Sequence, residues 1–131
     1  MKVSRSTGYG LLAVCYIARN KNQKLVLSHE ISEKYKIPLE YLLKIMQQLV
    51  RAKILRSKRG PRGGFRLAKP ASRISMLEII EAVDGSVTGG LRLGAKASRE
   101  KSGKKIKLAH NKAVKEAEKV FQRTKLAALI K

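Results

Sequence analysis

The chain is short of aromatic, acidic and cysteine side chains, and each shortage argues against a class of protein. Among its 131 residues there is no Trp, and only 5% are aromatic. A surface that stacks unpaired bases is therefore disfavoured, since such surfaces depend on aromatic platforms. The one cysteine, Cys15, can form neither an intrachain disulfide nor, within one subunit, a thiolate metal cluster.

Long apolar runs are also missing. No stretch approaches the roughly 20 apolar residues that span a bilayer, and no signal-peptide core follows Met1 and Lys2. A membrane-surface role needs basic residues opposite an apolar helix face, whereas the densest basic region here is rich in glycine. We therefore expect no membrane partner, and a cytoplasmic, nucleoid-associated location.

Positive charge is abundant. Thirty Lys and Arg stand against nine Asp and Glu, which gives a formal net charge of +21. No acidic residue occurs between Glu40 and Glu78, and nine basic residues crowd into 51–73. Because self-repulsion of this size is tolerable mainly beside a polyanion, the charge indicates a nucleic-acid partner.

Residues 1–86 have the pattern of a winged helix-turn-helix domain. Ser4 is a candidate N-cap for a first helix. A third helix from about residue 39 to 53 carries Leu42, Ile45 or Met46, and Leu49 at the spacing of a buried face. Short strands at 54–57 and 65–67 enclose a glycine turn. The predicted fold class is therefore mainly α, with a small β-hairpin wing.

The remaining residues are expected to form a loop and a helix for self-association. A capping box at Ser75 and Glu78 and a stop at Gly85 bound the last helix of the domain. Residues 87–104 are rich in Gly, Ser and Lys and predict a flexible loop. Residues 105–131 predict a helix and tail, and an apolar series from Ile106 to Phe121 needs a second subunit to cover it. The tail could pack on either subunit.

Four stretches of the chain form a recognisable set, namely Ser4-Arg5-Ser6-Thr7-Gly8-Tyr9-Gly10, Leu39-Glu40-Tyr41-Leu42, Leu55 to Phe65, and Ile79 to Gly85. Together they resemble the Rrf2 family of bacterial winged helix-turn-helix transcription regulators, which includes IscR-like and CymR-like proteins. The resemblance implies a homodimer joined through its C-terminal helices on a partly palindromic operator. It also implies recognition helices in adjacent major grooves and wings in the flanking minor grooves, and we expect a repressor.

One feature of the resembling family is absent. Its sensor members hold an iron-sulfur cluster through three cysteines that follow the winged domain. The comparable positions here are Leu91, Ser98 and Lys107, and Lys107 to His110 replaces a cysteine-led stretch. Leucine and lysine cannot ligate iron as thiolates do. We therefore predict no cofactor and no metal site, and the sequence identifies no small-molecule or protein effector.

The predicted DNA contacts of the wing centre on its tip, where glycine permits close approach and arginine suits a narrow minor groove. The other basic residues would contact phosphates, or would merely keep a solvated turn soluble. The wing residues are Arg56, Lys58, Arg59, Pro61, Arg62 and Arg66.

Two further groups complete the predicted site. On the third helix, long polar side chains can read base edges, although Tyr41 could instead pack on the domain. At the start of the first helix, resemblance to the family implies phosphate contacts, and plain capping is the alternative. The two groups are Glu40, Tyr41, Lys44 and Gln48, and Ser4, Arg5, Thr7 and Tyr9.

Catalysis has little support. The glycine turn at 60–64 lacks the Gly-Lys-Ser/Thr ending of a nucleotide loop, and no carboxylate pair or nucleophile with a base emerges. The sequence therefore predicts a DNA-binding transcriptional regulator and no enzyme. Two alternatives stay open, namely a basic RNA-binding or ribosome-associated winged-helix protein, and a protein-interaction module whose basic wing is incidental.

Overall fold

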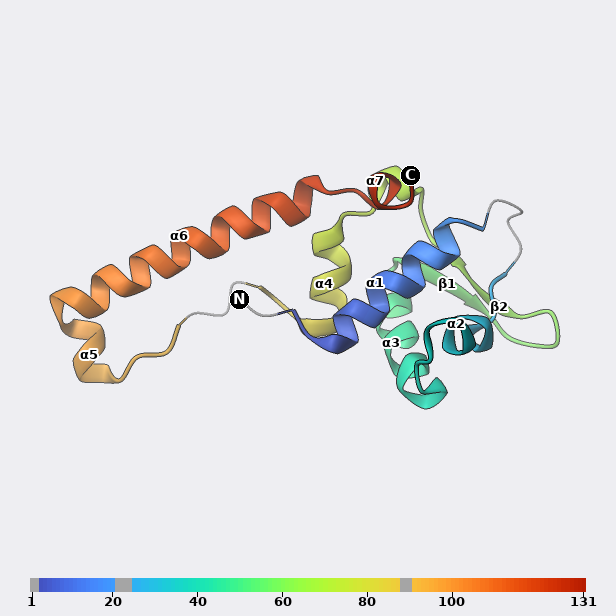
Figure 1. Cartoon of the computed structure of the whole chain (residues 1–131), viewed down its shortest axis with the longest axis horizontal. Coiled ribbons are helices and arrows are strands. Elements are labelled where there is room, and N and C mark those ends of the chain that lie inside the picture. Colours follow the sequence, from blue (N-terminus) through green and yellow to red (C-terminus); the bar gives the residue numbers. More distant parts are fainter. Residues whose placement is uncertain (1–2, 21–24, 88–90) are drawn as a thin grey trace.

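The computed structural model describes residues 3–20, 25–87 and 91–131. The elements form a helical body with a hairpin at one end and a long helix reaching toward the other (Figure 1). In order they are α1 (Arg5–Ala18), α2 (Ser28–Tyr35), α3 (Leu39–Arg51), β1 (Leu55–Lys58), β2 (Gly64–Leu67), η1 (Ala71–Arg73), α4 (Met76–Asp84), α5 (Ala95–Arg99), α6 (Lys101–Arg123) and α7 (Leu126–Leu129). The predicted fold class is confirmed.

The core of the body lies where α1, α3 and α4 meet. The apolar face of α3 is buried as its spacing predicts, and both Ile45 and Met46 belong to it. Gly10 of α1 allows α3 and α4 to approach α1 closely, because a Cβ there would lie 3.2 Å from Val83 Cγ2 of α4 and 3.3 Å from Ile45 Cγ2 of α3. The position of α3 is therefore fixed by packing against two helices.

Side chains and turns set the helix ends. The Ser4 and Ser75 hydroxyls each accept a 3.1 Å hydrogen bond, from the Thr7 and Glu78 amides respectively, and both predicted N-caps are confirmed. Between α2 and α3 the chain turns at Lys36, whose φ is 54°.

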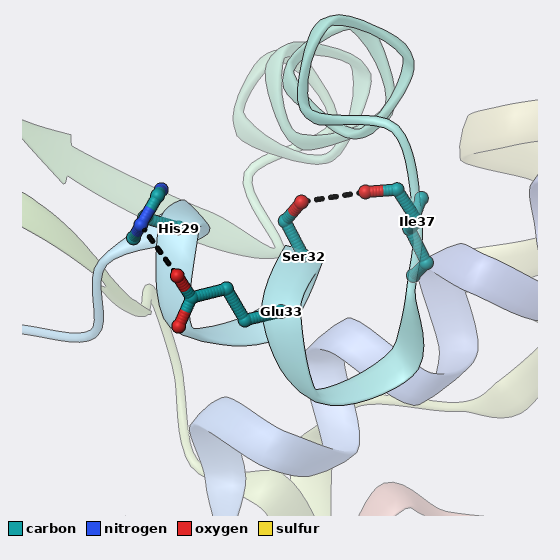
Figure 2. Close-up of polar contacts among 4 residues, drawn as sticks. All are labelled: His29, Ser32, Glu33 and Ile37. Carbon is teal, nitrogen blue, oxygen red and sulfur yellow. Dashed lines mark hydrogen bonds and ion pairs between the residues drawn. The ribbon is translucent and has the colours of Figure 1, made fainter.

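The Ser32 side chain closes that turn. Its Oγ donates a 2.5 Å hydrogen bond to the Ile37 carbonyl (Figure 2). The Ile37 amide in turn donates to the Ser32 carbonyl at 3.0 Å. His29 and Glu33 form an exposed pair along α2 with 2.8 Å between Nε2 and Oε1. The turn thus holds the start of α3 against the end of α2, which sets the direction of the helix that the sequence predicts will enter DNA.

The wing, residues 55–67, is an antiparallel hairpin rooted in the domain. Leu55 pairs with Leu67 and Lys58 with Gly64. Val26 adds a one-residue bridge, because Val26 and Phe65 exchange two 2.8 Å backbone hydrogen bonds. A Cβ on Gly63 would lie 2.2 Å from the Lys58 carbonyl oxygen. The glycine is therefore a steric requirement of the hairpin.

The prediction of a loop over 87–104 is wrong for its C-terminal part. α5 occupies Ala95–Arg99, and α6 begins at Lys101, four residues earlier than the predicted helix at 105. Residues 88–90 lie outside the described part. Gly103 explains the error, because a Cβ there would lie 1.7 Å from the Ala97 carbonyl oxygen. The glycine that suggested a loop lies instead where α5 and α6 make close contact.

The tail packs on its own domain. Leu126 is fully buried in the core. Its amide donates to the Ile74 carbonyl at 2.8 Å, and the Met76 amide donates to the Thr124 carbonyl at the same distance. Of the two alternatives for the tail, the structure shows packing on the same subunit. No helix in the described ranges has the length and apolar character to cross a membrane.

Candidate nucleic-acid interface

The exposed side of α3 is a ridge of four polar residues spaced at i, i+4, i+7 and i+11. They are Glu40, Lys44, Gln47 and Arg51, and all are exposed. The spacing places them on one face of the helix, opposite the buried face. Such a ridge is the part of a recognition helix that can meet base edges in a major groove.

The structure brings two of the four predicted α3 residues to this ridge, Glu40 and Lys44. Gln48 is half-buried on a flank, and its Nε2 lies 3.5 Å from the Val83 carbonyl oxygen of α4 as a hydrogen-bond donor. Gln47 takes the exposed place that was predicted for Gln48. Helical spacing could have distinguished them, because Gln47 lies closer than Gln48 to the mean direction of Glu40, Lys44 and Arg51 around the helix axis.

Tyr41 connects α3 to the start of α1. Its hydroxyl hydrogen-bonds with the Ser6 Oγ, and its ring meets that of Tyr9 edge-on with centroids 5.8 Å apart. Tyr41 nevertheless stays 40% exposed. It therefore packs on the domain while keeping part of its surface available beside the ridge.

The other flank of α3 faces the wing across an open groove. From α3 the groove is lined by Leu43, Gln47, Val50 and Arg51, and from the wing by Ser57, Lys58, Arg59, Gly64 and Phe65. Leu43 therefore lies between the two surfaces and outside the fully buried core. The groove makes the ridge and the wing neighbouring parts of one surface.

All six predicted wing residues are exposed. Within the described ranges none of the five basic ones is within ion-pair distance of a carboxylate. Arg56 lies directly opposite Arg66 in the hairpin ladder, and like charges in that position destabilise a strand pair. An anion beside the hairpin would relieve this repulsion.

The predictions for the start of α1 need correction. Thr7 is fully buried and cannot contact a phosphate in this conformation. Ser4 is bound to the end of α4, because its amide donates to Asp84 Oδ2 at 3.0 Å and its hydroxyl to Oδ1 at 2.5 Å. Both residues fasten α1 to α4. Arg5 is exposed and Tyr9 half-buried, so these two remain candidates for phosphate contact.

The contact with Ser4 makes the stability of the fold depend on the protonation state of Asp84. Partial burial acts to raise the pKa of Asp84, but hydrogen bonds from the Ser4 hydroxyl, the Ser4 amide and the Thr7 side chain outweigh it and hold the pKa below its ordinary value. A carboxyl group with a lowered pKa stabilises the fold above its unfolded pKa, and this contribution disappears as the pH falls through the folded pKa.

We therefore expect Asp84→Asn to lower the free energy of unfolding at neutral pH. The deficit should shrink as the pH falls below about 4, the ordinary range of an aspartate, because the wild-type carboxyl is then protonated too. Urea unfolding of the wild type and the variant at neutral pH and below about pH 4 measures this deficit. The control is Glu81→Gln in the same helix. A deficit of equal size at both values would contradict the assignment.

Side chains that could ligate iron are sparse and scattered in the described part of the chain. No group of three or more His, Cys, Asp or Glu within the described ranges is arranged to hold a metal ion. Cys15 is half-buried in α1, and burial raises the pKa of its thiol although Arg19 acts to lower it. A thiol held protonated is a poor ligand. The Nδ1 atom of His110 is buried without a hydrogen-bond partner in the described structure, and a single histidine cannot hold a cluster.

Comparison with known proteins identifies relatives over most of the chain. The Rrf2 family model, described as iron-dependent transcriptional regulator, matches residues 3–131. The regulator IscR of Cereibacter sphaeroides is 35% identical over 114 residues, which are 86% of this chain and 73% of that protein. The putative regulator BadM of Rhodopseudomonas palustris is 41% identical over 80 residues, 61% of this chain and 51% of that protein. The chain thus spans about half the length of BadM.

Solved structures share the fold. The global cysteine regulator CymR of B. subtilis superposes with a TM-score of 0.81 at 24% identity, covering 99% of this chain and 96% of that one. IscR of T. potens gives a TM-score of 0.77 at 26% identity, covering 99% and 86%. The long α6 and the returning α7 therefore belong to the shared architecture.

Proposed function

This chain belongs to the Rrf2 family of transcriptional regulators, and from that premise we propose that it binds duplex DNA as a homodimer and represses transcription at a partly palindromic operator. The observation that carries the proposal is the groove in which the α3 ridge and the basic wing face each other. One surface can then meet a major groove and the flanking minor groove together.

Within this proposal the exposed residues take separate roles. Lys44 can donate to guanine, Gln47 can pair with adenine, and Glu40 can accept from cytosine. Arg59 and Arg62 at the wing tip enter the minor groove, beside Pro61. Seven further residues of the site contact phosphates in this proposal. These are Arg5, Tyr9, Tyr41, Arg51, Arg56, Lys58 and Arg66.

The homodimer is proposed from α6. An apolar stripe runs along this helix, formed by Ile106, Ala109, Ala113, Ala117 and Val120, and all but Ala117 are exposed. Ile106 is 49% and Val120 59% exposed, although apolar surface of this kind is normally covered. A second copy related by a two-fold axis would cover both stripes and give the palindromic operator its matching symmetry.

A competition experiment tests this function against RNA binding. DNA from upstream of the gene for this protein is footprinted with the purified full chain, first alone and then with transfer RNA in excess. We expect a protected, partly palindromic segment that persists, because recognition by α3 requires a major groove that A-form RNA does not open. We also expect transcription in vitro from that promoter to fall.

Unlabelled duplex carrying the protected segment serves as the matched competitor. If transfer RNA removed the footprint as efficiently as this duplex, the chain would be a general RNA-binding protein. If the protein protected the DNA but transcription rose, DNA binding would be supported and the proposal that the protein is a repressor would be overturned.

A further inference from the structure

A large share of the positive charge lies outside the surface described above. Residues 87–131 contain thirteen Lys and Arg against three Glu, although this third of the chain includes neither α3 nor the wing. Most of these basic residues belong to α6. A dimerisation helix needs an apolar face but no such excess of charge, since repulsion between two basic subunits opposes association.

Six of the eight basic residues of α6 form a stripe on one face of the helix. Its members recur every three or four residues, and all are exposed. The basic stripe consists of Lys101, Lys105, Lys112, Lys115, Lys119 and Arg123, with Leu108 completing the spacing. Among the members of the basic stripe, which all lie in the described ranges, only Lys119 pairs with a carboxylate, that of Glu116 at 3.4 Å. Helical spacing turns the basic stripe about a quarter turn or more from the apolar stripe, so a second subunit on the apolar stripe leaves the basic stripe open.

The basic stripe is distant from the wing. α6 carries α5 at one end of the molecule, and the β1–β2 hairpin forms the opposite end (Figure 1). A duplex held in the groove between α3 and the wing of one subunit therefore does not follow α6 of that subunit. We propose that the basic stripe of α6 binds the backbone of a second DNA duplex, so that the protein bridges two segments of DNA.

The dimensions and chemistry of the basic stripe favour duplex DNA. The 23 residues of α6, at about 1.5 Å each, extend about 35 Å, close to one turn of B-form DNA. A straight row of cations at this length matches a straight polyanion, and contacts to phosphate alone need no sequence. No aromatic residue belongs to the basic stripe, so stacking on single strands is unsupported. The neighbouring apolar stripe is mostly alanine, which gives little affinity for a lipid surface.

A bridging assay tests the proposal. A biotinylated duplex of about four helical turns is fixed on beads, the full-length protein is added, and retention of a second, fluorescent duplex is measured. The variant Lys105→Gln/Lys112→Gln/Lys115→Gln removes three charges from the basic stripe and keeps helix-forming side chains. We expect retention to fall by about tenfold or more, while affinity for a single duplex changes by about twofold at most.

The control is Lys107→Gln/Lys125→Gln/Lys131→Gln, which removes equal charge away from the basic stripe and should retain the second duplex as the wild type does. Sedimentation checks that both variants keep the wild-type oligomeric state. Equal retention by both variants overturns the proposal, because the two winged domains alone would then account for bridging. The proposal is also overturned if the basic-stripe variant loses binding to transfer RNA or to phosphatidylserine vesicles but still bridges two duplexes. Because affinity for a single duplex is measured separately, failure of the basic stripe is distinguishable from failure of the proposed function.

Discussion

Replacing Arg59 and Arg62 together with alanine is expected to weaken binding to the footprinted duplex by about 100-fold at physiological salt. Each arginine lies exposed at the wing tip, and the loss of one such contact to DNA amounts to roughly 1–3 kcal/mol. The slope of log K against log salt should also fall by about two, since two fewer counterions are released. Fluorescence anisotropy titrations at several salt concentrations measure both quantities.

The matched control is Lys125→Ala/Lys131→Ala, which lowers the net charge equally at exposed positions outside the wing. It should change affinity by only about twofold, because long-range field effects are screened beyond about 10 Å. Neither pair should shift the melting temperature, since none of the four side chains is part of the core. Unchanged binding after loss of both wing arginines would favour the protein-interaction module with an incidental wing.

The second large effect is expected from Ile106→Glu with Val120→Glu, which should convert the dimer to a monomer. Covering the apolar stripe with a second copy would then bury four carboxylates per dimer, and burying an unpaired charge is opposed by several kcal/mol. We expect the dimer dissociation constant to rise by about 1,000-fold or more, which sedimentation equilibrium measures. Operator affinity should fall with it, because only one half-site is held.

Leu108→Glu is the control for this experiment. Leu108 is 71% exposed on the same helix but belongs to the basic stripe, so the dimer should persist. Truncation of the chain before α6 is a poorer test, because it also removes α7 with Leu126, which is fully buried in the core. Truncation would mix lost dimerisation with a core cavity worth about 2–5 kcal/mol. A double variant that sediments like the wild type would refute the dimer interface on α6.

Most of the winged domain could be predicted from the sequence because its signals are local. Helix caps at Ser4 and Ser75, the turn before Pro38 and the glycines of the wing each act within a few residues. The apolar face of α3 depends on helical spacing alone. The prediction failed at Gly103, because a glycine that suggests a loop can equally mark a close contact between two helices.

The sequence by itself therefore determined the main elements of the winged domain, their order, the excess of positive charge and the resemblance to the family. Only the tertiary structure decided which side chains remain available for DNA. It placed Gln47 outward and turned Gln48 toward Val83, and it used Ser4 and Thr7 to hold Asp84. The physical reason is that secondary structure follows from neighbours along the chain, whereas hydrogen bonds between residues about 80 positions apart exist only after helices have packed.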